Sequence, residues 1–225
     1  MDAQFQKNIW NDYFKKNKIT DNFLKSRYEY LFKKLKNLKS TGRLLEIGYG
    51  NGYLLNLAKN YEVYGTDICT TNNNQNFVIF NSDITKKINW ESNYFDLIVA
   101  SEVLEHIDKK KIPQSLIEIK RVLKKGGFFI GTVPLNEELS SEMVLCPYCN
   151  KTFHKWGHED SYSIDKLYKL FLQYGFEIIE IKPVFIFSKY NGLWKNKRLI
   201  YAYLNYYFFR NNLNSGNIYF CIKKK

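Results

Sequence analysis

The chain has 225 residues, of which 45% are apolar and 25% charged, and it carries a formal net charge of +12. This balance is typical of a soluble globular protein with room for one α/β domain and a small insertion. No apolar run reaches the roughly 18 residues that span a bilayer, and the first residues lack a signal-peptide pattern, so we expect a cytoplasmic protein without a transmembrane segment.

The positive charge is concentrated at the two ends of the chain. Residues 1–43 carry eleven basic and four acidic side chains, residues 181–225 carry nine basic and none acidic, and residues 44–180 are net acidic. Basic ends can serve an anionic substrate, a peripheral membrane contact or nucleic acid. The alternative is a compositional bias, because Lys outnumbers Arg 29 to 5 and Arg is the residue expected at bidentate phosphate sites.

The periodicity of apolar residues predicts the order of the elements. Residues 1–39 are predicted to form an N-terminal helical cap, with helix over 3–38, and residues 40–225 the main domain. That domain contains a polar insertion at 135–160 and an aromatic and basic lid segment at 185–212. Strands are predicted at 43–48, 63–66, 77–80, 95–100, 128–133, 176–182 and 217–223, and helices at 52–59, 113–124 and 163–175. The alternation predicts an α/β fold with a doubly wound, seven-stranded, mainly parallel sheet and helices on both faces.

Three glycines at alternate positions interrupt an apolar run, and a second apolar run follows them. The stretch reads Leu44-Leu45-Glu46-Ile47-Gly48-Tyr49-Gly50-Asn51-Gly52-Tyr53-Leu54-Leu55. It predicts a buried strand, a tight turn and the first turn of a helix. Glycine lets a ligand approach the main chain closely, and the helix N-terminus adds unpaired N–H groups. At the end of a parallel strand, such a turn binds nucleotide-like cofactors.

Two acidic residues follow the glycine turn at the ends of the next two strands. Asp67 lies 19 residues after Gly48, and Asp83 lies 16 residues after Asp67. Asp67 could accept hydrogen bonds from both hydroxyls of a ribose. Asp83 could accept from the exocyclic amine of an adenine, with Ile84 packed on the ring. The alternative for each is a carboxylate that caps a turn or helix.

The motifs resemble those of the class I S-adenosylmethionine-dependent methyltransferases. A nicotinamide fingerprint needs a small residue where this chain has Tyr53. G-x-G-x-G after Glu46 instead resembles the first motif of the methyltransferase family. Tyr94-Phe95-Asp96-Leu97-Ile98 followed by Glu102-Val103-Leu104-Glu105-His106-Ile107 resembles the fourth-strand signature of its small-molecule branch, and Leu123-Lys124-Lys125-Gly126-Gly127 the turn before its fifth strand.

The resemblance implies S-adenosylmethionine as the cofactor and direct in-line transfer of its methyl group. It also implies a set of cofactor-binding residues, with Asp67 as the ribose-binding acid and Asp83 as the adenine-binding acid. The full set is Glu46, Gly48, Tyr49, Gly50, Gly52, Asp67, Ile68, Asp83, Ile84, Ser101 and Glu102.

The insertion contains a pattern typical of a metal site. Cys146, Cys149, His154 and His158 follow the spacing C-x2-C-x4-H-x3-H. Two thiolates and two imidazoles suit tetrahedral zinc, which would order so small a segment, as in a zinc knuckle. The alternatives are a pair of free cysteines beside polar histidines, or zinc held by three of the four with one histidine facing the substrate.

The acceptor of the methyl group is the least constrained part of the prediction. His106 is the candidate catalytic base, with Glu102 and Glu105 as alternatives, and a structural histidine is the competing interpretation. Ala100-Ser101-Glu102-Val103 stands where amino-group DNA methyltransferases carry an Asn/Asp-Pro-Pro-aromatic motif, which disfavours base methylation by that route. We expect O-methylation of a small molecule or a glycan- or lipid-linked precursor. Methylation of RNA or protein through the basic ends, and a non-catalytic S-adenosylmethionine-binding module, are the alternatives.

Overall fold

A computed structural model describes residues 22–68, 77–186 and 216–225, together with single positions at 8, 197, 200, 201, 203 and 204. The predictions for residues 1–21 and most of the lid segment therefore lie outside the described residues. The sheet has seven strands in the order β3-β2-β1-β4-β5-β9-β8. Among the described strands, β9 runs opposite to the other six, so the predicted α/β fold with a mainly parallel seven-stranded sheet is confirmed. Their bounds are β1 (Arg43–Ile47), β2 (Glu62–Asp67), β3 (Val78–Asn81), β4 (Phe95–Ser101), β5 (Leu123–Pro134), β8 (Phe176–Val184) and β9 (Asn217–Lys224).

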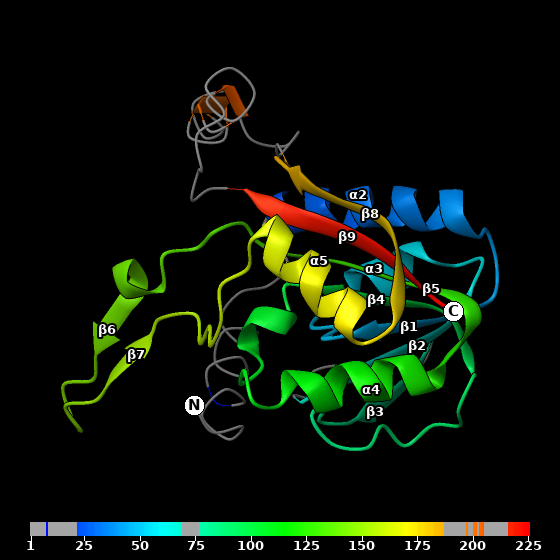
Figure 1. The fold of residues 1–225 in the computed structure, drawn as a ribbon, viewed down its shortest axis with the longest axis horizontal. Helices are drawn as coiled ribbons and strands as arrows, with labels where there is room; N and C mark the ends of the chain where they lie inside the picture. Colours follow the sequence, from blue (N-terminus) through cyan, green and yellow to red (C-terminus); the bar gives the residue numbers. More distant parts are fainter. Residues whose placement is uncertain are drawn as a thin grey trace.

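Helices cover both faces of the sheet, as Figure 1 shows. The helix α2 (Asn22–Leu38) and the short α3 (Tyr53–Leu57) pack on one face, and α4 (Ile112–Val122) and α5 (Ile164–Gln173) on the other. Neighbouring residues of a strand serve opposite faces: Leu44 belongs to the α2 side and Leu45 to the α4 side. This alternation follows from the two-residue period of a strand.

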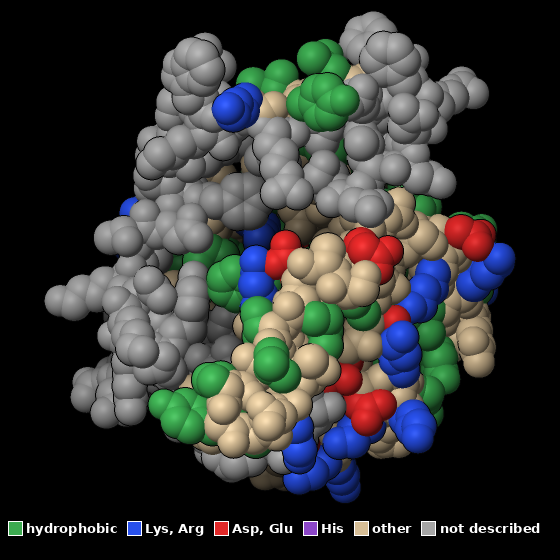
Figure 2. Space-filling model, turned by 90° about the vertical axis from the view of Figure 1, so that its left-hand side faces the viewer, with side chains coloured by type: hydrophobic (Ala, Val, Ile, Leu, Met, Phe, Trp, Pro, Cys, Tyr) green, Lys and Arg blue, Asp and Glu red, His purple; other side chains and the backbone are tan. Residues whose placement is uncertain are grey.

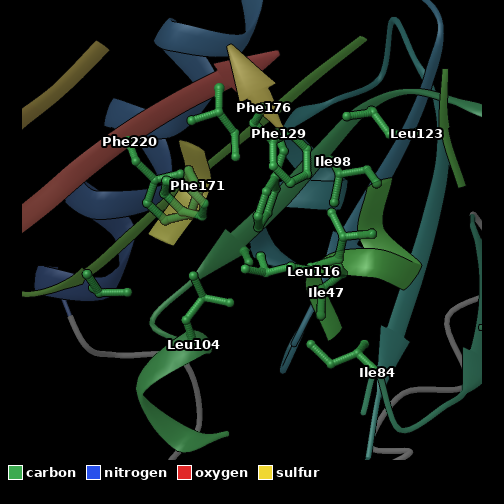
Figure 3. Close-up of a cluster of buried hydrophobic side chains, with 14 of the residues drawn as sticks. Ile47, Ile84, Ile98, Leu104, Leu116, Leu123, Phe129, Phe171, Phe176 and Phe220 are labelled. Carbon is green, nitrogen blue, oxygen red and sulfur yellow. The ribbon is translucent and has the colours of Figure 1, made fainter. Parts of the chain in front are cut away.

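The core beneath α4 and α5 is rich in aromatic side chains (Figure 3). Phe129 of β5 and Phe220 of β9 lie with ring centroids 5.1 Å apart, and Phe171 of α5 lies 5.0 Å from Phe220. All three are fully buried. The helix α5 begins where Ser163 accepts a hydrogen bond from the Lys166 backbone N–H, as expected of an N-cap serine. The two layers of helices thus fix the sheet rigidly beneath the loops at its carboxyl edge.

The boundary between α4 and β5 differs from the prediction. Lys124 to Gly127 were expected to form the turn before a strand at 128, yet β5 begins at Leu123. Leu123 pairs with Phe95, and the register shifts before Phe128 pairs with Leu97. Lys124 donates to the Asp96 carboxylate at 2.8 Å. Lys39, the residue that follows α2, donates to the same carboxylate at 2.5 Å. Pairing with β4 therefore overrides the local turn preference of two glycines.

The insertion forms a hairpin that stands away from the sheet (Figure 1). A short 3-10 helix, η2 (Leu139–Glu142), precedes β6 (Met143–Leu145), which pairs with β7 (Thr152–His154). Leu145 and Tyr148 are 60% and 96% exposed.

Figure 2 looks onto this side of the molecule, and charged side chains gather mainly toward its right and lower edges. Among the described residues, no helix is long and apolar enough to cross a membrane.

Candidate active site

The carboxyl ends of β1, β2, β3 and β4 surround one cavity of about 450 Å³. Eight of the eleven predicted cofactor residues line its wall, and so does the candidate base His106. The eight are Gly48, Gly50, Asp67, Ile68, Asp83, Ile84, Ser101 and Glu102. The carboxyl edge of the parallel sheet, where ligands of such folds bind, therefore brings the predicted residues together.

The glycine turn leaves room only for main chain. Gly48 has φ of +70°, and a Cβ atom added there would lie 2.6 Å from the Val103 side chain. Gly50, also at positive φ, donates its backbone N–H to Asp67 Oδ2 at 3.1 Å. The turn is thus tied to the acid at the end of β2. A polar ligand can approach the backbone here, which fits the cofactor that the sequence predicts.

Asp83 forms a turn at the strand end and also lines the cavity. Its Oδ1 accepts hydrogen bonds from the backbone N–H and the hydroxyl of Thr85 at 2.9 and 2.6 Å. These bonds form a turn of the kind that aspartate favours. The same residue lines the cavity beside Ile84, which is 7% exposed. The turn therefore holds the carboxylate at the cavity wall.

Three predicted cofactor residues lie behind the wall. Glu46 is fully buried in β1, and its two carboxylate oxygens have no hydrogen-bond partner among the described residues. Burial, and then the nearby Asp67, raise the pKa of Glu46 well above its ordinary value. The ring of Tyr49 packs against Gly65, where an added Cβ would lie 2.9 Å from Tyr49 Cδ1. Gly52 is the N-cap of α3 at φ 72°. These positions support the turn from beneath.

Glu102 lies at the point where β4 ends and is held from two sides. Its backbone has a left-handed φ of 54°. Asn217 Nδ2 donates to its two carboxylate oxygens at 3.0 and 2.9 Å, and Arg27 Nη1 lies 3.7 Å from Oε2. Ser101, next to it, lies with its hydroxyl 3.3 Å from that of Thr132. A residue of α2 and one of β9 therefore fix a carboxylate at the cavity wall.

Two histidines, His106 and His158, also line the cavity. His106 ends the 3-10 helix η1 (Leu104–His106), and its Nδ1 donates to the Gly157 carbonyl at 3.3 Å. Its ring lies 4.7 Å from that of His158, and His158 Nδ1 donates to Glu137 Oε2 at 2.5 Å. Burial, helped by His158, lowers the pKa of His106 to about 3. His106 is therefore neutral at physiological pH.

The four predicted zinc ligands are not gathered in one place. His154 and His158 lie with their rings stacked at 4.6 Å. Cys146 and Cys149 flank the turn of the hairpin, where the backbone N–H groups of Cys149 and Tyr148 lower the pKa of the Cys146 thiol. In the hairpin register, His154 pairs with Met143 at the far end from the turn, roughly 10 Å along the strand. Within the described part of the chain, no cysteine joins a cluster able to hold a metal, and the Cys2His2 zinc site stays a prediction.

The sequence reasoning missed several residues of the cavity wall. Arg27 and Tyr28 come from α2, and Glu137 and Trp156 from the insertion. Arg27 carried a signal, since it is one of only five arginines in a chain with 29 lysines. The others carried none, because their approach to the cavity depends on how α2 and the insertion pack.

Comparison with known proteins agrees with this geometry. The family described as a methyltransferase domain matches residues 17–181. This is well over half of the chain, and the chain belongs to this family of class I S-adenosylmethionine-dependent methyltransferases. The family recognised from the motifs is therefore confirmed. The search of curated proteins found no match.

Solved structures resemble the chain in fold. A phosphoethanolamine N-methyltransferase from Haemonchus contortus in complex with S-adenosyl-L-methionine superposes with a TM-score of 0.59 at 17% identity, over 87% of this chain and 52% of that one. The chain thus spans about half the length of that protein. An S-adenosylmethionine-dependent methyltransferase from Mesorhizobium loti gives a TM-score of 0.61 at 11% identity, over 87% and 96% of the two chains. One from Methanosarcina mazei gives 0.59 at 16%, over 85% and 96%.

Proposed function

We propose that the protein binds S-adenosylmethionine in the cavity and methylates a small acceptor, or the small terminal group of a glycan- or lipid-linked precursor. The observation that carries the proposal is the continuity of the cavity. One wall is formed by the glycine turn, Asp67 and Asp83, and the other by His106 and His158. A cofactor held at the first wall would direct its reactive end toward the second.

The residues that would hold the cofactor fit its chemistry. Asp67 would accept from the ribose hydroxyls and Asp83 from the adenine amine, while the main chain at Gly48 and Gly50 would lie along the ligand. Arg27 and Glu102, 3.7 Å apart, offer one charge of each sign to an amino acid group. When bound, S-adenosylmethionine supplies an electrophilic methyl group on a sulfonium.

The far wall would position the acceptor. His106, His158, Trp156 and Ile107 line it, which combines ring faces and an apolar side chain with imidazole nitrogens. Because His106 Nδ1 donates to a carbonyl, the neutral ring has its lone pair on Nε2. It can accept a hydrogen bond from an acceptor hydroxyl, which supports O-methylation. Holding an acceptor in line is worth roughly 7 kcal/mol or more of the barrier.

The size of the cavity favours a small acceptor group. About 450 Å³ falls in the range of small-molecule pockets, roughly 300–1,000 Å³. A cofactor bound at the glycine turn would occupy part of this volume. What remains would admit a hydroxyl-bearing group of a few atoms, so we propose that a larger acceptor enters by one end only.

The experiment has two readouts on the full chain. Titration calorimetry with S-adenosylhomocysteine should show one binding site. Radiolabelled S-adenosylmethionine should then transfer its methyl group to a member of a panel of small hydroxylated molecules and lipid-linked glycans, with RNA and protein included. Label found only in RNA or protein would contradict the acceptor class, and binding without any transfer would favour a non-catalytic module. The absence of binding would refute the proposal as a whole.

A further inference from the structure

Three potential metal ligands meet at the far wall of the cavity. One ligand atom from each of Glu105, His106 and His158 lies within 4.8 Å of the other two. Glu105 and His106 are neighbours in η1, and His158 comes from the end of the insertion. The backbone N–H groups of Glu159 and Asp160 donate to the Glu105 carbonyl at 2.7 and 3.2 Å. Two distant segments are therefore bonded together at this point.

Both imidazoles are oriented by a hydrogen bond at Nδ1. His106 Nδ1 donates to the Gly157 carbonyl at 3.3 Å, and His158 Nδ1 donates to the Glu137 carboxylate at 2.5 Å. In each ring the lone pair is then on Nε2. Metal-binding histidines in proteins have this arrangement, in which a carbonyl or carboxylate receives the other N–H and fixes the ring.

The carboxylate of the third ligand, Glu105, makes no hydrogen bond among the described residues. Glu105 is fully buried. Burying an isolated carboxylate is very unfavourable unless it is paired or binds a metal. The positive charge of Arg27 acts on it electrostatically, but the Arg27 Nη1 atom lies beside the Glu102 carboxylate. The group that would satisfy Glu105 is a cation beside His106 and His158.

We propose that Glu105, His106 and His158 bind a divalent transition-metal cation of the zinc type, and that Glu137 is a positioning residue for His158. Two imidazoles and one carboxylate suit such a cation. Three protein ligands leave at least one coordination position open, as in catalytic rather than structural zinc sites. His106 and His158 line the cavity, so an oxygen of the acceptor is the ligand expected there; with the cation present, that oxygen binds the cation and does not donate to His106 Nε2. This last assignment rests on the proposed function, but binding of the cation does not.

A second cluster in the same region is a poorer site. Glu137, His154 and His158 also bring ligand atoms within 4.8 Å of one another. However, His154 Nδ1 accepts a hydrogen bond from the His158 backbone N–H at 3.2 Å. The proton of neutral His154 is then on Nε2, which faces Glu137 Oε1 at 3.7 Å. His154 offers a proton on this side where a cation requires a lone pair.

The test is a titration of the chelator-treated full chain with Co²⁺ and Zn²⁺. Co²⁺ should bind once per chain and give ligand-field absorption without a thiolate charge-transfer band, because no cysteine is a ligand. E105Q and H158Q should weaken binding of both metals at least 100-fold. E137Q should weaken it by roughly 10- to 100-fold, the usual effect of a partner that orients a ligand. The neighbouring exposed E138Q, and the double variant C146S/C149S, should bind as the wild type does.

Binding of S-adenosylhomocysteine, measured on the same proteins, shows that each variant is folded. A thiolate band that disappears in C146S/C149S would overturn the proposal in favour of the Cys2His2 site. So would metal affinity unchanged in both E105Q and H158Q. Failure of wild type to bind either cation while it binds S-adenosylhomocysteine would remove the cation site and leave the proposed function. If wild type bound the metal but not S-adenosylhomocysteine, the cation site would stand and the proposed function would be refuted.

Discussion

Replacing Asp67 by Asn tests the cofactor site at its most specific contact. The carboxylate terminates β2, lines the cavity and accepts from Gly50 N–H at 3.1 Å. Hydrogen bonds to a charged group are worth about 1.5–3 kcal/mol each, and those between neutral groups about 0.5–1.5 kcal/mol. Asn keeps one acceptor but loses the charge and presents an amide where a ribose hydroxyl would donate. We therefore expect a loss of about 2–3 kcal/mol, which is roughly a 30- to 150-fold weaker Kd.

Calorimetric titration of S-adenosylhomocysteine into D67N and wild type measures this difference. The matched control is D165N, because Asp165 is an exposed residue of α5 that pairs only with Lys169 in the described structure. D165N should bind as the wild type does, and thermal unfolding of D67N without ligand should stay close to that of wild type. A loss smaller than threefold in D67N, or an equal loss in D165N, would refute the assignment of Asp67 to the ribose.

Three further predictions concern stability and are measured by urea unfolding. An added Cβ at Gly131 would lie 2.0 Å from the Ala100 carbonyl oxygen on the neighbouring strand, so G131A should cost roughly 3 kcal/mol or more. Gly126 has φ of +76° and open space around it, so G126A should cost only about 1 kcal/mol. If the two costs were equal, close packing between β4 and β5 would not be the cause. At Asp96, burial opposes ionisation, but two lysines and a backbone N–H lower its pKa to about 2, so D96N should cost about 2 kcal/mol at neutral pH. Because the folded pKa is lowered, this stabilisation is present above the ordinary carboxyl pKa near 4 and is lost as the pH falls through about 2. A difference between D96N and wild type that persists at low pH would contradict this.

The positions of the candidate cofactor residues could be predicted because each one follows from a local sequence pattern. The glycine turn, Asp67 and Asp83 each follow a strand, and parallel strands bring their carboxyl ends to one edge. Gly48, Gly50, Asp67 and Asp83 all line the cavity at that edge. Local pattern failed where pairing competed with it, as in Leu123 to Gly127, which enter β5.

The acceptor half depends on contacts between distant segments, which spacing alone does not give. His106 and His158 are 52 positions apart in the chain, and their rings lie 4.7 Å apart where the Glu105 carbonyl accepts from Glu159 and Asp160. The spacing of Cys146, Cys149, His154 and His158 predicted one compact site, on the assumption that the segment folds on itself. In the structure, His154 is buried at the end of the hairpin next to the sheet, whereas Cys149 is exposed beside the hairpin turn.

Several basic side chains of α2 and its flanking residues form ion pairs with acidic side chains in or beside the sheet. Lys34 pairs with Glu180 of β8 at 2.9 Å, and Lys39 with Asp96 of β4. Arg27 extends inward to Glu102 at the cavity wall. Part of the positive charge that could indicate nucleic-acid binding is therefore neutralised within the protein. Five acids of the middle segment line the cavity, namely Asp67, Asp83, Glu102, Asp108 and Glu137, and they favour a ligand that carries positive charge, such as a sulfonium or a divalent cation. The ion pairs of Arg27, Lys34 and Lys39 thus give part of the positive charge in and beside α2 a structural role.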